Sequence, residues 1–331
     1  MKVSAVFAVY NATWCVERAL DSVLGQTVPP DEILVCDDGS TDGTPELIES
    51  SFGSAVTVLR LPHRNASAAR ADGLARARGD WLAFVDADDT WLPHKLEAQL
   101  EYLARHPEVR HVSSDGVYVS SDRVLRESWL SDYFDPVREL NGDLLALLVE
   151  RCFVLMSSVM VEARAYREVG GIDPKMIYSH DYDLWMRIAA RHPMAVMPDR
   201  LITYFSSPNA LSKRYEARHR DNLELMSRVE RGELRADPAL MRRGSRRAAD
   251  LAYDLGVLCL RDGRAAEARP YLRRAMQEGP ATRRILSAAG AMLPAWAFGP
   301  LSRLSWLRGR VHRSREVFGH IGSSDMARDE R

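Results

Sequence analysis

The chain has 331 residues, of which 46% are hydrophobic and 27% charged, and its formal net charge is -1. This length allows one large domain or two ordinary ones, and the composition is that of a globular protein. The near-zero net charge argues against a nucleic-acid partner. Four cysteines without C-x-x-C spacing argue against zinc and against a disulfide framework, and favour a reducing cytoplasm. These cysteines are Cys15, Cys36, Cys152 and Cys259.

The sequence favours neither a signal peptide nor a membrane span. The N-terminus carries one lysine and a short apolar run, and it lacks a small-residue cleavage pattern. Only residues 285–302 approach the length of a spanning helix, and they contain Pro294 and Pro300. We therefore expect a protein without a transmembrane helix.

The first 90 residues alternate apolar strands with amphipathic helices, which predicts a parallel sheet with right-handed crossovers. Val3–Val9 is apolar apart from Ser4, a pattern typical of a strand covered on both faces. The helix predicted over residues 14–24 has its apolar side chains on one stripe. The other elements predicted here are strands at 33–36, 55–61 and 81–85 and a helix over 66–77.

Beyond residue 90 the pattern is less regular. Pro93 suits the first position of a helix that runs to about Arg105. The other elements predicted in this part are strands at 109–119, 153–161 and 201–204 and helices over 142–151 and 181–191.

From about residue 216 the chain changes to long helices rich in Ala, Arg and Leu. A segment at about 246–280 resembles one tetratricopeptide helical hairpin, and a single copy cannot stack into a solenoid. We therefore expect an α/β domain at 1–215 and a helical C-terminal region at 216–331 that ends in a basic amphipathic tail.

Acidic residues close two of the predicted strands. Asp37-Asp38 follows the second strand, Asp86-x-Asp88 follows the fourth, and Tyr10 follows the first. Ligands of parallel sheets bind beyond the carboxyl ends of the strands, and carboxylates that converge there need a cation or hydrogen-bond donors. Mg²⁺ or Mn²⁺ shared with a diphosphate meets this need. The alternative is that these acids are turn residues and helix caps.

Four blocks resemble the family 2 glycosyltransferases with the GT-A fold across residues 1–215. The resemblance implies a Rossmann-like, mostly parallel α/β sheet with helices on both faces, with residues 1–120 binding a nucleotide-sugar and 121–215 the acceptor. It also implies inverting transfer of a sugar from a nucleoside diphosphate to an acceptor hydroxyl. The blocks read VFAVYNATWCVERALDSVLGQT, EILVCDDGSTDGT, NASAARADGLARARGDWLAFVDADDTWLPHKL and VGGIDPKMIYSHDYDLWMRIAAR.

Matched position by position, the resemblance assigns roles around the donor. Tyr10 would stack on the base, Asp38 would hydrogen-bond it (usually uracil), and Asp86 would face the ribose. Asp88 would ligate Mn²⁺ or Mg²⁺, which neutralises the departing diphosphate. The remaining residues assigned to the nucleotide-sugar are Val9, Arg64, Arg70 and Ala87.

Asp181 matches the general base of the family, since an inverting displacement needs one base and no enzyme nucleophile. His180 and Trp185 would belong to the acceptor site. The alternative makes Asp181 a helix N-cap and Trp185 a core residue. Arg64 and Arg70 are equally well explained as arginines on a helix surface.

The sequence departs from the family pattern in three places. Ala8 replaces a proline, residues 63–71 lose both asparagines and the glycine of a family block, and His180 replaces a glutamate. The first two predict a different pocket around the diphosphate-sugar, and the third changes the charge near the acceptor. His63 as a metal ligand is a further alternative. The Q-x-x-R-W motif of processive synthases does not occur, so we expect a non-processive enzyme.

The acceptor class stays open among a glycan, a lipid-linked sugar and a protein, in cell-surface polysaccharide or glycoconjugate synthesis. Residues 301–318 place arginines and apolar side chains on different faces of one helix, which suits an anionic membrane surface. We expect a cytoplasmic protein, either peripheral on the inner face of the cytoplasmic membrane or with this tail packed on the catalytic domain. The rival functions are a sugar nucleotidyltransferase and a non-catalytic nucleotide-binding scaffold that uses the helical tail.

Overall fold

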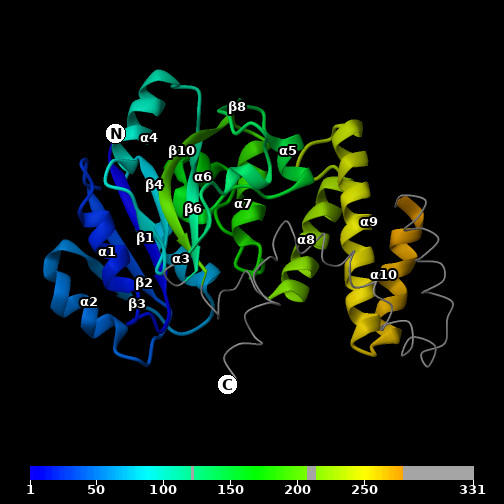
Figure 1. Cartoon of the computed structure of the whole chain (residues 1–331), viewed down its shortest axis with the longest axis horizontal. Coiled ribbons are helices and arrows are strands. Elements are labelled where there is room, and N and C mark those ends of the chain that lie inside the picture. The colour runs from blue at the N-terminus through cyan, green and yellow to red at the C-terminus, as the bar shows by residue number, and fades with distance from the viewer. Residues whose placement is uncertain (121–122, 207–213, 279–331) are drawn as a thin grey trace. The chain divides into compact units, whose positions relative to one another are not determined.

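The computed structural model describes residues 1–120, 123–206 and 214–278. The chain divides into two compact units, Met1–Arg214 and Tyr215–Arg331. Figure 1 shows a sheet with helices in the first unit and helices alone in the described part of the second. Within the described ranges, no helix combines the length and the hydrophobicity needed to cross a membrane.

Two predicted features lie outside the described residues. One is the apolar stretch at 285–302 and the other is the basic amphipathic tail at 301–318.

The first unit contains a ten-stranded sheet. Its strands are β1 (Val3–Val9), β2 (Glu32–Asp37), β3 (Thr57–Arg60), β4 (Trp81–Asp86), β5 (Thr90–Trp91), β6 (His111–Ser120), β7 (Arg123–Arg126), β8 (Leu140–Gly142), β9 (Met160–Glu162) and β10 (Met194–Phe205). Its helices are α1 (Val16–Leu24), α2 (Thr44–Phe52), α3 (Ala66–Arg76), α4 (Lys95–Arg105), α5 (Leu145–Glu150), α6 (Ala163–Glu168) and α7 (His180–Ala189), and its 3₁₀ turns are η1 (Gly53–Ala55), η2 (Leu130–Asp132) and η3 (Met156–Ser158).

Both faces of the central strands are buried, which explains their unbroken apolar sequences. Alternate residues of β1, such as Val3 and Phe7, pack in one core with apolar residues of α1, α2 and α4. The opposite face meets α3 and α7, where Gly73 approaches Val6 and Phe84 makes an edge contact with a tryptophan of α7. The fold class predicted from the sequence is confirmed, with helices covering both faces of the sheet.

The strand order is β3-β2-β1-β4-β9-β6-β10-β5. Strands β3, β2, β1 and β4 are parallel, as the alternation of strands and helices predicts. Beyond β4 the sheet is mixed, because β9 runs antiparallel to both β4 and β6 while β6 and β10 are parallel. Parallel pairing is therefore confined to the first half of the sheet and to the pair of β6 and β10.

Two local predictions were wrong. The segment predicted as a strand at 153–161 contains the turn η3, and only its end belongs to the short strand β9. The hydroxyl of Ser157 in this turn accepts from the backbone nitrogen of Asp86 and donates to the carboxylate of Asp89. Pro93 does not start a helix, since α4 begins at Lys95 after a turn. The helix α2, the short strands β5, β7 and β8 and the helix α6 have no counterpart among the predicted elements.

The described part of the second unit consists of α8 (Tyr215–Glu230), α9 (Pro238–Arg261) and α10 (Ala265–Glu278). Asp237 caps α9 by accepting from the backbone nitrogens of Ala239 and Leu240. A short turn with Gly263 at φ 76° joins α9 to α10.

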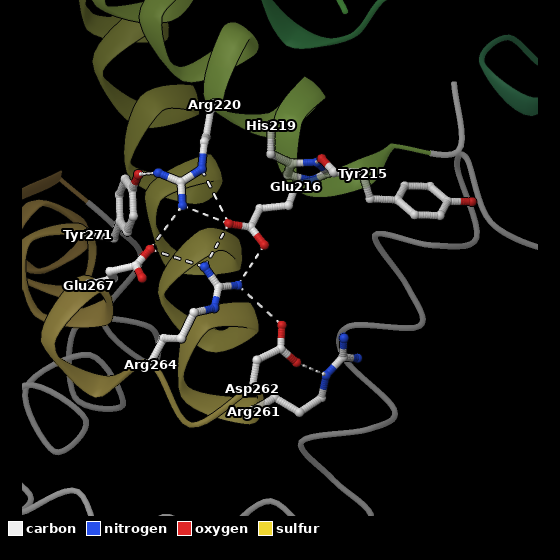
Figure 2. A network of polar contacts seen from close by, with 9 residues as sticks. All are labelled: Tyr215, Glu216, His219, Arg220, Arg261, Asp262, Arg264, Glu267 and Tyr271. Carbon is white, nitrogen blue, oxygen red and sulfur yellow. Dashed lines mark hydrogen bonds and ion pairs between the residues drawn. The ribbon is translucent and has the colours of Figure 1, made fainter. Parts of the chain in front are cut away.

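Charged side chains join the three helices of this unit. Figure 2 shows Glu216 and Glu267 directed at Arg220 and Arg264. Glu216 lies 2.6 Å from each of the two arginines, and Glu267 lies 3.1 Å from Arg264 and 3.3 Å from Arg220. These contacts fix the start of α8 to the turn between α9 and α10.

Candidate active site

The carboxyl ends of β1, β2 and β4 meet at one edge of the sheet. Val9 is paired with Asp37 across the β1–β2 register, and Ala8 with Asp86 across the β1–β4 register. The backbone nitrogen of Asp38 donates to the carbonyl of Val9 at 2.9 Å. Side chains that follow these three strands are therefore neighbours, as expected for ligand-binding residues of such a sheet.

Some acidic residues at this edge accept hydrogen bonds from neighbouring loop residues. The carboxylate of Asp37 accepts from the backbone nitrogen of Ser40, and Asp42 accepts from Thr13 and Thr44. For these two residues the alternative of a turn or cap is correct. Together with Asn11, whose φ is 49°, they brace the loop after β1 against the loop after β2.

Asp38 has a different environment. Its side chain is 3% exposed, and Oδ1 accepts from the backbone nitrogen of Arg64 at 2.8 Å. Oδ2 lies 3.0 Å from Nδ1 of His63 but is buried without a hydrogen bond. The ring of His63 stacks on Tyr10 with 4.4 Å between ring centroids, and Tyr10 is 48% exposed. An exposed aromatic face thus lies beside a buried carboxylate oxygen that still lacks a donor.

Three carboxylates crowd the loop after β4. Burial, helped by the charge of Asp86, raises the pKa of Asp88 to about 6. Burial also raises the pKa of Asp89 well above its ordinary value, and the charges of Asp88 and Asp86 add to this effect. Asp89 accepts from the hydroxyl of Ser157 at 2.5 Å and from the backbone nitrogen of Phe205 at 3.0 Å. Its carboxylate holds the loop in place, while Asp88 and Asp86 are the acids beside it.

Arg70 lies beneath this loop rather than on a helix surface. It is 2% exposed, and its Nη2 lies 2.5 Å from Oδ1 of Asp86. Its Nη1 lies 3.1 Å from Nε2 of His180, whose Nδ1 lies 3.2 Å from the carbonyl of Ile177. Because an arginine only donates, His180 accepts at Nε2 and carries its proton on Nδ1. Burial lowers the pKa of His180, which agrees with a neutral ring.

The contact between Arg70 and His180 connects the two predicted halves of the site. Asp181 follows His180 in the first turn of α7, is partly exposed, and accepts from the backbone nitrogen of Tyr182 at 2.7 Å. The N-cap of α7 is Ser179 and not Asp181. Asp181 is therefore a partly exposed carboxylate at the positive end of a helix, next to His180, which Arg70 connects to Asp86.

Trp185 does not lie where an acceptor could reach it. It is fully buried, with edge contacts to Phe84 at 5.3 Å and to His111 at 4.8 Å between ring centroids. This placement argues against the predicted acceptor role and agrees with the core alternative. The tryptophan instead anchors α7, and with it Asp181, to the sheet.

The other predicted donor residues contribute in different ways. Val9 is 2% exposed and its carbonyl already accepts from Asp38, while Ala87 is partly exposed in the loop after β4. The guanidinium of Arg64 pairs with Asp72 on α3. His63 lies against Asp38 and Tyr10, which argues against the alternative that it is a metal ligand in the Asp86–Asp88 loop.

Two residues of the site were missed by the sequence analysis. Ser157 joins the end of β4 to Asp89, and Arg18 on α1 donates to the backbone carbonyl of Asp88 at 2.8 Å. Ser157 lies 71 positions from Asp86 and Arg18 lies 70 positions from Asp88, so no local pattern indicates either contact.

The donor set of the loop after β4 fits a hard divalent cation. Asp88 is a carboxylate whose pKa is raised by burial and by a second carboxylate, and a cation would relieve both effects. Among the described residues, Glu216, Cys259 and Glu267 also have ligand atoms within 4.8 Å of one another. There Arg220 and Arg264 already neutralise the carboxylates, so this group does not need a cation.

Residues 4–160 match the family described as glycosyl transferase family 2. The chain is 28% identical over 204 residues to the Escherichia coli UDP-Glc:alpha-D-GlcNAc-diphosphoundecaprenol beta-1,3-glucosyltransferase WfaP, covering 61% of this chain and 76% of WfaP. It is 27% identical over 194 residues to an uncharacterised glycosyltransferase of Rickettsia felis, covering 58% of this chain but only 32% of that relative. The chain thus spans about a third of the length of the second relative.

Solved structures share the fold at low sequence identity. Residues 1–349 of S. aureus TarS align with a TM-score of 0.63 at 15% identity, covering 93% of this chain and 92% of the TarS chain. The mannosyltransferase PcManGT from Pyrobaculum calidifontis, in complex with GDP-Man and Mn²⁺, aligns with a TM-score of 0.61 at 19% identity, covering 96% and 85%. Residues 4–160 therefore resemble glycosyltransferase family 2, and the chain shares the GT-A-type fold of these solved structures.

Proposed function

We propose that the chain is an inverting, non-processive glycosyltransferase that moves a sugar from a nucleoside-diphosphate sugar to an acceptor hydroxyl. The observation that carries this proposal is the meeting of Tyr10, Asp38, Asp86 and Asp88 at one sheet edge, linked to Asp181 through Arg70 and His180. The family match across residues 4–160 favours transfer over the rival functions of nucleotidyl transfer and scaffolding.

The donor nucleotide is uridine diphosphate in this proposal. Asp38 has one carboxylate oxygen already occupied by the backbone of Arg64, and one buried oxygen that lacks a hydrogen bond. A uracil ring, like thymine, presents a single imide N–H, which suits one free oxygen, whereas guanine presents two adjacent N–H donors. The relative WfaP, whose name specifies UDP-Glc, points to the same nucleotide.

The chemistry follows from the groups on the edge. Asp88 would hold a divalent cation, Mn²⁺ or Mg²⁺, and the charge of that cation would neutralise the departing diphosphate. Arg70 holds Asp86 beside it, where that carboxylate can face the ribose. Asp181 takes the proton of the acceptor hydroxyl, and the start of α7 favours its ionised form.

The acceptor in this proposal is a lipid-linked sugar diphosphate of cell-surface polysaccharide synthesis. This choice rests on the printed name of WfaP, which specifies a diphosphoundecaprenol acceptor. A free glycan or a protein acceptor would leave the donor chemistry unchanged.

The test is sugar transfer in the presence of Mn²⁺ from UDP-, GDP- and dTDP-sugars to a polyprenyl-diphosphate sugar. Formation of a disaccharide-diphosphate lipid from a UDP-sugar, and its loss in EDTA, is the expected result. Nucleotide binding without transfer to any acceptor class would favour the scaffold instead.

A further inference from the structure

His63 lies on the loop between β3 and α3, at the position that the proposed function assigns to the nucleobase. Its ring stacks on Tyr10 with an interplanar angle of 20° and 4.4 Å between ring centroids. Its Nδ1 lies 2.8 Å from the backbone carbonyl of Asp38 and 3.0 Å from Oδ2 of the same residue. A planar ring with an N–H group thus occupies the aromatic face and the acceptor group expected to hold uracil.

The fit of His63 to Asp38 is incomplete. Because a carbonyl oxygen only accepts, Nδ1 carries the proton and donates it to the carbonyl of Asp38. The carboxylate oxygen Oδ2 is therefore covered by the ring but receives no hydrogen bond. A ligand that donates an N–H to Oδ2 supplies the hydrogen bond that His63 does not supply.

The backbone beside His63 is held firmly, while its side chain is not. A Cβ atom on Gly39, whose φ is 74°, would lie 2.9 Å from the backbone nitrogen of His63, so the two loops are in close contact. The next residue, Arg64, donates its backbone N–H to Asp38. The side chain of His63 is 56% exposed, so its ring can change rotamer without moving this loop.

We propose that the ring of His63 occupies the nucleobase site in the absence of nucleotide. This ring must leave Tyr10 and Asp38 when the nucleotide binds. The inference rests on the proposed function, since it takes the Tyr10–Asp38 position as the base site. It makes His63 a determinant of nucleotide affinity, because every nucleotide that binds must displace its ring. Groups without a base do not compete with it.

The test is isothermal titration of the full chain with UDP and Mn²⁺. His63→Ala should bind UDP about 3- to 10-fold more tightly than the wild type, because competition by the ring is gone. His63→Phe keeps the stack on Tyr10 but has no N–H for Asp38, so its affinity should fall between the two. His94→Ala, an exposed histidine at the start of α4, is the matched control and should leave the affinity unchanged.

Inorganic diphosphate with Mn²⁺ provides the second arm, because it has no base. Its affinity should be the same in the wild type and in His63→Ala. Weaker or unchanged UDP binding in His63→Ala would overturn the inference, since the ring would then support the base or be irrelevant to it. A wild-type chain that binds no nucleoside diphosphate would instead refute the proposed function, and the inference with it.

Discussion

Two groups of carboxylates among the described residues differ in their charge balance, one in the loop after β4 and one around Glu216 in the helical unit. In the loop after β4, burial and a neighbouring carboxylate raise the pKa of Asp88 to about 6. In the helical unit, hydrogen bonds from Arg264 and Arg220 lower the pKa of Glu216 to about 2. Among the described residues, Glu216, Cys259 and Glu267 have ligand atoms within 4.8 Å of one another, and two arginines already balance the charge of this group.

Close spacing of ligand atoms therefore does not by itself make a cation site, because the charge balance decides whether the carboxylates need a cation. The arginines around Glu216 already supply the positive charge that a metal ion would supply. Asp86 is paired with Arg70, and Asp89 accepts hydrogen bonds from Ser157 and Phe205. This leaves Asp88 as the acid whose ionisation a cation would favour. Four predictions test and sharpen this distinction, from the largest expected effect to the smallest.

Asp88→Asn should reduce Mn²⁺-dependent sugar transfer by about 10³-fold or more, because the cation contributes several kcal/mol to the transition state. Glu216→Gln is the matched control and should transfer sugar at the wild-type rate. Initial rates with saturating UDP-sugar measure both. Full activity of Asp88→Asn, or wild-type activity that persists in EDTA, would contradict the assignment of Asp88.

Asp181→Asn should reduce turnover by roughly 10²–10⁴-fold and leave UDP affinity within a few-fold of the wild type. Asp183, two residues after Asp181, is the comparison residue because it is fully buried and lies 2.6 Å from Arg187. Asp183→Asn should lower stability instead. Equal losses of UDP affinity and turnover in Asp181→Asn would show that this residue has a structural role.

The stability of the metal-free protein should depend on pH because of the raised pKa of Asp88. Since its pKa is about 6 in the folded chain and near 3.8 when unfolded, the folded state holds a proton that the unfolded state has released between these values. This contribution is fully present below about pH 4 and is lost as the pH rises through 6. Wild type should therefore lose on the order of 2 kcal/mol relative to Asp88→Asn between pH 4 and pH 7. The measurement is thermal unfolding of the two proteins in EDTA at several pH values. The same pH dependence of stability in both proteins would contradict this prediction.

Glu216→Gln should have the smallest effect, under about 1 kcal/mol at pH 7, because the pair lies at a surface where solvent screens it. The pH dependence of this contribution is opposite to that of Asp88. Because the pKa of Glu216 is lowered, its contribution to stability is present above its ordinary pKa and is lost as the pH falls through about 2. Thermal unfolding from pH 7 to pH 3 compares this variant with the wild type. A loss of several kcal/mol at pH 7 would place the network among the main supports of the helical unit.

Much of the donor half of the site could be predicted from the sequence. Strands β1, β2 and β4 are buried on both faces, so each is a continuous apolar run whose end is marked by polar residues. The structure ends these strands at Val9, Asp37 and Asp86, within a residue of the ends predicted. Parallel topology then suffices to bring the candidate ligands together.

Other parts depend on contacts that no local pattern reveals. The strands β5 and β9 have two and three residues, and they exist only because distant partners pair with them. The burial of Arg70 depends on His180, 110 positions away, and the placement of His63 depends on Asp38 and Tyr10. Such long-range contacts decide which polar residues face the ligand and which are internal supports.

Binding of Mn²⁺ tests the central claim most directly, and it can be followed by electron paramagnetic resonance in the presence of UDP. Wild type and Glu216→Gln should each bind one Mn²⁺ per chain, more tightly with UDP than without it. Asp88→Asn should lose this binding. If Asp88→Asn still bound Mn²⁺ like the wild type, or if Glu216→Gln lost the ion, the distinction between the two groups of carboxylates would be wrong.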